Sequence, residues 1–121
     1  MISIERSLSQ ADFDAFAAVS GDNNPIHVDP DFSARTRFGR TVSHGMLLYT
    51  VLWGLVQKHY PGARQVSQTL MFPNPTYAGD PHRFTLNEIA AADGHIVLST
   101  QVMRVADGAL TLDGQTEIGL P

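Results

Sequence analysis

The chain has 121 residues, of which 43% are apolar and 17% are charged, and this composition indicates a folded globular protein with one domain over residues 1–121. The absence of cysteine excludes disulfides and thiolate metal sites, and it is compatible with a cytoplasmic location. Eight basic residues against twelve acidic ones leave a net charge of −4, which disfavours a nucleic-acid partner.

Neither a leader peptide nor a membrane span is expected. Residues 1–9 lack the basic start and the apolar core of a signal peptide. The longest apolar run, residues 45–56, is broken only by Thr50 and is shorter than the ~20 residues that a helix needs to cross a bilayer. This run instead predicts a helix that is buried on most of its circumference.

The N-terminal residues predict a strand followed by a helix. Ile2 and Ile4 alternate with polar residues, as in an edge strand over residues 2–8. Ser9 is an expected N-cap, and Asp12, three residues later, resembles the second half of a capping box. The apolar positions of residues 11–19 then approximate one helical face.

Turn residues separate this helix from a second, short one. Residues 20–25 contain a glycine, two asparagines and a proline, which is turn chemistry. Asp29 is an expected N-cap with Pro30 at the first helical position, and the helix is expected to continue to about Thr36.

The long central helix is expected over residues 44–59, with Ser43 as its cap and Tyr60-Pro61-Gly62 as its end. Strand-like segments follow at residues 65–72, 83–89, 95–105 and 109–118. Asp93-Gly94 and Asp107-Gly108 predict tight hairpins between the later strands.

Helices followed by hairpin-linked strands indicate an α+β fold, in which an antiparallel sheet packs against one long helix. Pro73 and Pro75 cannot donate to a strand ladder, so the first long strand must bulge there or lie at an edge. A curved sheet of about five strands around the central helix would bury its apolar run. The open sheet edges favour an edge-to-edge dimer.

A polar loop carries the residues that point to chemistry: Asp22, Asn24 and His27. Asp22 and His27 are five residues apart across a turn with a proline, so both can reach one water molecule as an acid–base pair. The helix that opens at His44-Gly45 offers backbone N–H groups without internal partners, which can stabilise an oxyanion. Together these groups predict the addition of water to an activated double bond, or its removal.

The sequence resembles the MaoC-like, (R)-specific enoyl-CoA hydratase family of hot-dog folds. The residues that carry the resemblance, about a third of the chain, are Phe16 to His27, Asp29, Phe32, Ala34, Phe38-Gly39-Arg40 and His44 to Leu47. The strand half agrees only in pattern.

The resemblance implies one hot-dog domain, an antiparallel sheet curved around the long central helix, and a homodimer or a higher homo-oligomer. It implies (R)-specific hydration of a trans-2-enoyl-CoA to an (R)-3-hydroxyacyl-CoA, or the reverse dehydration, with an acyl-CoA thioester as the bound partner and no cofactor or metal. Asp22 and His27 match the acid–base pair, and Gly45 matches the glycine whose N–H faces the thioester oxygen. Asn24 matches an asparagine that helps to hold the loop, and with His44 it is expected at the substrate side. Which residue carries which proton is open.

One position departs from the family pattern. Where better-known hydratases have a serine that holds the catalytic aspartate, this chain has Trp53. Thr50, one turn earlier on the same face, is a candidate substitute for that serine. Alternatively, Trp53 narrows the acyl channel and limits the chain length of the substrate.

Other functions remain open at this level. The same chemistry could act on an acyl-carrier-protein substrate or on a branched or dicarboxylic acyl-CoA. A hot-dog protein could also bind acyl-CoA without turnover. A thioesterase is disfavoured because residues 44–57 carry no carboxylate, which thioesterases usually place on this helix.

The remaining polar residues receive weaker assignments. A metal site from His27, Asp29 and His44 is conceivable, but its spacing matches no strong motif. The candidates for contact with CoA phosphates are Arg35, Arg37 and Arg40. The histidines expected at the surface are His59, His82 and His95.

Overall fold

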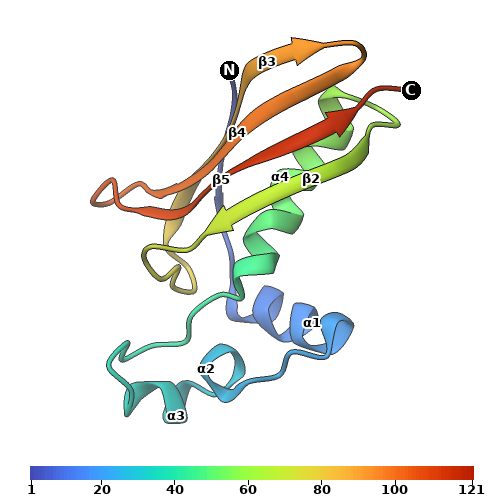
Figure 1. Ribbon diagram of the computed structural model, residues 1–121. Helices are drawn as coiled ribbons and strands as arrows, with labels where there is room; N and C mark the ends of the chain where they lie inside the picture. Colours follow the sequence, from blue (N-terminus) through green and yellow to red (C-terminus); the bar gives the residue numbers. More distant parts are fainter.

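The computed structural model of the protein describes residues 1–121 and shows a five-stranded sheet beside one long helix (Figure 1). The elements in chain order are β1 (Ile2–Ser7), α1 (Gln10–Ser20), α2 (Pro25–Val28), α3 (Pro30–Ala34), α4 (Gly45–His59), β2 (Arg64–Met71), β3 (Pro81–Ala92), β4 (His95–Arg104) and β5 (Leu110–Gly119). All neighbouring strands are antiparallel, in the order β1-β3-β4-β5-β2. This is the predicted α+β hot-dog architecture.

The core lies where α4 meets the sheet. Leu52 and Val56 of α4 share one buried cluster with Phe84, Leu98 and Leu112 from three strands, and each is at most 1% exposed. Burial of each such side chain contributes about 1.5–3 kcal/mol. This packing fixes α4 against the sheet, and therefore fixes where its N-terminus points. None of the helices is both long and apolar enough for a membrane crossing.

The three shorter helices all lie at one end of α4. In Figure 1, α1, α2 and α3 gather beyond the N-terminal end of α4, away from the sheet. β1 and β2 form the edges of the sheet, which agrees with the edge position predicted from Pro73 and Pro75. β2 ends at Met71, before both prolines.

Several local signals are confirmed atom by atom. The hydroxyl of Ser9 accepts the N–H of Asp12 at 3.1 Å, and the Asp12 carboxylate accepts the N–H of Ser9 at 2.8 Å. The carboxylate of Asp29 accepts two N–H groups from the first turn of α3 at 3.0 Å. Asp93 and Gly94 both have positive φ angles, 54° and 76°, as a tight two-residue hairpin requires.

The predicted turn lies between α1 and a short helix, α2, which was not expected and which Asn24 caps. Two other local expectations were wrong. Ser43 does not cap α4, because its hydroxyl donates to the carbonyl of His44 at 2.9 Å. The strands β4 and β5 are joined by a loop longer than a two-residue turn, in which the Asp107 carboxylate accepts the N–H of Ala109 at 3.0 Å.

His82 is buried, at 1% exposure, and not at the surface as expected. It lies on β3 between Arg6 of β1 and Arg104 of β4. Its Nδ1–H donates to the carbonyl of Asp80 at 2.7 Å, while its Nε2 is buried without a partner. Burial lowers the pKa of His82 below 6.5, although the hydrogen bond to Asp80 opposes this shift. His82 is therefore neutral in the folded protein at pH 7.

This burial predicts a loss of stability in mild acid. The unfolded chain binds a proton at His82 near pH 6.5, before the folded protein does, so the free energy of unfolding should fall as the pH drops from 6.5 toward the lower folded pKa. His82→Asn keeps a donor for the Asp80 carbonyl and does not titrate. Denaturant unfolding between pH 7.5 and 5 should show a shallower pH dependence for this variant. An unchanged dependence would contradict the assignment.

Candidate active site

A cavity of about 510 Å³ lies at the N-terminal end of α4. Asp22, His27, His44 and Gly45 all line it, so four of the six predicted site residues come together. Asn24 and Trp53 are not among its lining residues. The structure therefore gathers the predicted acid–base pair and the helix start around one space.

Asp22 sits in the turn that ends α1. Gly21 terminates the helix with a φ of 80°, and its N–H returns to the carbonyl of Ala17 at 3.0 Å. The hydroxyl of Ser20 then accepts the N–H of Asp22 at 3.1 Å. The side chain of Asp22 is 56% exposed, so its carboxylate can reach both solvent and the cavity.

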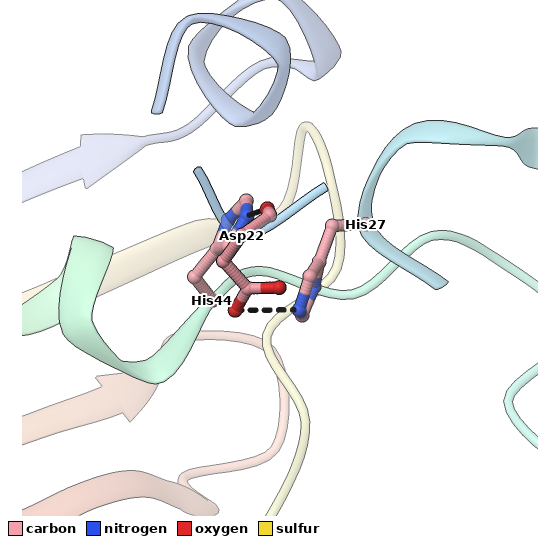
Figure 2. Close-up of side chains that lie close together, drawn as sticks. All are labelled: Asp22, His27 and His44. Carbon is pink, nitrogen blue, oxygen red and sulfur yellow. Dashed lines mark hydrogen bonds and ion pairs between the residues drawn. The ribbon is translucent and has the colours of Figure 1, made fainter. Parts of the chain in front are cut away.

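His27 is a residue of α2, and its ring is buried and held in one orientation. Its Nδ1 lies 2.7 Å from the carbonyl of Val42. Because a carbonyl only accepts, Nδ1 carries a proton, and in the neutral ring Nε2 is then unprotonated. That Nε2 lies 3.7 Å from Oδ2 of Asp22, and a dashed line in Figure 2 marks this pair. Two acceptors thus face each other at a separation that one hydrogen-bond donor can bridge.

Neighbouring segments hold the backbone of α2. The N–H of Val42 donates to the carbonyl of Ile26 at 2.9 Å. The amide of Gln10, on α1, donates to the carbonyl of His27 at 2.8 Å and accepts from the hydroxyl of Thr41 at 2.6 Å. His27 is therefore positioned by α1 and by the strand-like segment before α4, and not only by its own loop.

The ring of His44 is 2% exposed and contacts both members of the pair. Its Nε2 lies 2.7 Å from the backbone carbonyl of Asp22, and its ring stacks on that of His27 with centroids 3.8 Å apart. Its Nδ1 is buried without a partner. Burial lowers the pKa of His44; the hydrogen bond to Asp22 opposes the shift and the nearby His27 adds to it.

The N-terminus of α4 opens into the same cavity without a side-chain cap. The N–H of Leu47 returns to the carbonyl of His44 at 3.2 Å, whereas Gly45 and Met46 have no carbonyl one turn earlier within the helix. Gly45 lies close to the ring of Phe72. A Cβ there would lie 2.6 Å from Cε1 and Cζ of Phe72, which also lines the cavity. The loop after β2 thus covers the helix start.

Comparison with known proteins gives the family. The family model described as "MaoC like domain" matches residues 2–110. The chain belongs to the MaoC-like family. It is 34% identical to the (R)-specific enoyl-CoA hydratase of Aeromonas caviae, over 98% of this chain and 90% of that protein. It is 32% identical to a mitochondrial 3-hydroxyacyl-[acyl-carrier-protein] dehydratase of Arabidopsis thaliana, over 96% of this chain and 72% of that protein.

Solved structures agree with the fold. An unliganded (R)-hydratase from Pseudomonas aeruginosa aligns with a TM-score of 0.92 at 32% identity, over 99% of this chain and 79% of that chain. The (R)-hydratase of A. caviae aligns with a TM-score of 0.87 at 32% identity, over 99% of this chain and 93% of that chain. These matches make the chain a hydratase or dehydratase of the MaoC-like family.

The position that departs from the family pattern lies away from the pair. Trp53 is half-buried and packs against the core cluster. Thr50 is exposed, and its hydroxyl donates to the carbonyl of Met46 at 2.8 Å. Thr50 therefore does not take the place of a serine that holds Asp22. A limit on chain length set by Trp53 stays a prediction.

Donor atoms that could hold a divalent cation come from Asp22, His27 and His44, and lie within 4.8 Å of one another. Asp29, the third residue of the conceivable metal site, is the cap of α3, as predicted. Each histidine already gives one ring nitrogen to a backbone carbonyl, so each has one left for another role.

The three arginines that were candidates for contact with CoA phosphates have different surroundings. Arg40 pairs with Asp80 at 3.3 Å, donates to the carbonyl of Ala78 at 2.7 Å and lies over the ring of Tyr77. Arg37 lines the cavity, and its guanidinium lies 5.0 Å from the ring centroid of Phe38. Arg35 ends α3 and is exposed.

Phe72 and Val42 were not identified from the sequence as residues of the site, because only the tertiary fold brings them there.

Asn24 provides a test of how the loop is held. Its side-chain oxygen accepts the N–H of Ile26 at 3.1 Å and so caps α2, which carries His27. Asn24→Ala should lower the free energy of unfolding by about 1 kcal/mol, whereas Asn24→Asp should keep the cap. Denaturant unfolding of both variants measures this difference. Equal stability of Asn24→Ala and the natural protein would show that the cap contributes nothing.

Proposed function

We propose that the protein catalyses (R)-specific hydration of trans-2-enoyl-CoA to (R)-3-hydroxyacyl-CoA, or the reverse dehydration. The observation that carries this proposal is the facing pair of acceptors, Oδ2 of Asp22 and Nε2 of His27, 3.7 Å apart in a cavity that also holds the uncapped start of α4. Similarity to the hydratase of A. caviae supports the same reaction.

The pair is suited to bind the attacking water. Both atoms are acceptors when Asp22 is ionised and His27 is neutral, so one water can donate to each of them. As the oxygen of the water forms its bond to C3, one proton passes to the pair, the C2=C3 π bond breaks, and the pair returns a proton to C2. Water thus supplies both the hydroxyl group and the hydrogen. Delivery from one side of the double bond gives syn addition.

The helix start completes the mechanism. Attack at C3 places negative charge on the thioester oxygen. The N–H groups of Gly45 and Met46, free of internal partners, can donate to that oxygen at the positive end of the dipole of α4. The ring of Phe72 lies against this end of the helix. The thioester itself activates the double bond, so no cofactor enters the proposed reaction.

A second copy of the chain fits the open side of the molecule. Met46 on α4 is 45% exposed, and Thr50 and Gly54, at positions one and two turns later, are also exposed. β2 lies at a free edge of the sheet. A homodimer that pairs this edge would cover it. The single domain, residues 1–121, would be the repeating unit, and a cytoplasmic location fits the lack of cysteine.

The second candidate is the same dehydration on an acyl-carrier-protein substrate. The specific observation in its favour is the 32% identity to the dehydratase of A. thaliana. The net charge of −4 favours CoA over an acidic carrier protein. Kinetics with both carriers distinguish the two candidates.

Removal of either member of the pair should abolish most turnover without unfolding the protein. Asp22→Asn removes the carboxylate, and His27→Asn removes the Nε2 acceptor while it keeps a donor for Val42. Each should lower kcat/KM for a trans-2-enoyl-CoA by about a hundredfold or more. Loss of the enoyl-thioester absorbance measures the rate. Asp31→Asn, at an exposed position outside the cavity, is the matched control and should keep full activity. Near-natural rates for both site variants would refute the mechanism.

We predict that Arg37, which lines the cavity, contacts the phosphates of CoA. Arg37→Gln should raise KM for an enoyl-CoA by about tenfold, the value of one charge-assisted hydrogen bond. KM for the corresponding pantetheine thioester, which lacks the nucleotide, should not change. Arg35→Gln is the control, because Arg35 does not line the cavity. An equal rise in KM for both thioesters would place Arg37 against another part of the substrate.

A further inference from the structure

We propose that His44 is a positioning residue: its neutral ring ties the Asp22 loop and His27 to the start of α4. This inference rests on the proposed function, because it assigns His44 a role in that reaction. The role differs from the substrate contact expected of His44 from the sequence. It is carried by three contacts of one buried side chain (Figure 2).

The first contact restrains Asp22. The turn around Asp22 is exposed. Apart from its bond to His44, Asp22 forms hydrogen bonds only with residues within two positions, Ser20 and Asn24. The bond from Nε2 of His44 to the carbonyl of Asp22, at 2.7 Å, is the one that crosses from a distant part of the chain. Without it, the aspartate would be held to the rest of the fold only through its neighbours in the turn.

The second contact restrains His27. The two imidazole rings stack with centroids 3.8 Å apart and planes 25° from parallel. On another side, the ring of Phe16, from α1, meets His44 edge-on at 4.9 Å. His44 is therefore packed between α1 and α2, and it cannot turn without moving His27.

The third link is covalent. His44 directly precedes Gly45, and its carbonyl accepts the N–H of Leu47 in the first turn of α4. The residue that holds Asp22 and His27 is thus part of the helix start that faces the thioester oxygen. One side chain fixes the distance between the acid–base pair and the oxyanion donors.

The hydrogen bond also defines the tautomer. The carbonyl of Asp22 can only accept, so Nε2 carries the proton and Nδ1 is the buried, unprotonated atom without a partner. A positive ring would be poorly solvated at 2% exposure and would lie against the ring of His27. In this buried site the hydrogen bond from Nε2 to the carbonyl of Asp22, the tether, is therefore made by the neutral Nε2–H form.

Two substitutions separate the tether from the packing. His44→Phe keeps an aromatic ring against His27 but has no donor, and His44→Gln keeps a donor near the Nε2 position but has no ring. With a trans-2-enoyl-CoA, His44→Phe should lower kcat on the order of ten- to a hundredfold with little change in KM, because the aspartate is misplaced. His44→Gln should recover most of that loss. His59→Gln, at the exposed end of the same helix, is the control and should match the natural protein. An unaltered kcat for His44→Phe would overturn the proposal.

A double variant tests whether His44 acts through Asp22. In an Asp22→Asn background, His44→Phe should cause no further loss of kcat, because the carboxylate that it positions is already absent. A further loss as large as that in the natural background would overturn the proposal and indicate a general structural role. A natural protein inactive on every enoyl thioester would refute the proposed function alone, since the tether has a separate test.

That separate test needs no variant and no substrate. Nitrogen-15 NMR of the histidine rings in the natural protein should show His44 as the neutral Nε2–H tautomer at pH 7, with its proton in a hydrogen bond. A proton on Nδ1, or a charged ring, would overturn the proposal even if both substitutions fail to fold.

Discussion

The hydrogen bond between Nδ1 of His27 and the carbonyl of Val42, at 2.7 Å, determines what the rest of the site can do. In the neutral ring the only proton on nitrogen lies in this bond, so Nε2 faces Asp22 as an acceptor. If the ring carried its proton on Nε2 instead, that nitrogen would donate to the carboxylate of Asp22 and leave no acceptor pair for a water molecule. A backbone carbonyl thus sets which ring nitrogen of His27 carries the proton.

That bond has a consequence for the fold, because Val42 must itself be held. Val42 is 6% exposed, bridges to Tyr77 and bonds to Ile26 of α2. The segment that contains it leads directly into α4, whose position depends on burial against the sheet. The large core therefore serves catalysis indirectly, since it fixes the end of the helix and the segment before it. The exposed turn of Asp22 is then fastened to this rigid base through His44.

The sequence predicted what depends on local chemistry and on the family motif. The capping box at Ser9, the cap at Asp29 and the hairpin at Asp93-Gly94 involve residues within a few positions of one another, and all were confirmed. The motif placed Asp22, His27 and Gly45 at one site.

What the sequence could not give depends on contacts between distant residues. His82 follows a turn in the sequence, yet β1 and β4 bury it from both sides. The packing of Phe72 over Gly45 joins the loop after β2 to the start of α4, and no local pattern encodes it. Thr50 bonds to its own helix and not to Asp22, because its side chain lies on the exposed side of α4.

The central claim is that one pair delivers water to one side of the double bond. The most direct measurement of this is hydration of crotonyl-CoA in D₂O with the configuration determined at both carbons. The mechanism predicts a (3R)-3-hydroxybutyryl-CoA with deuterium added at C2 on the same side as the hydroxyl group. An anti product or a (3S) product would contradict it.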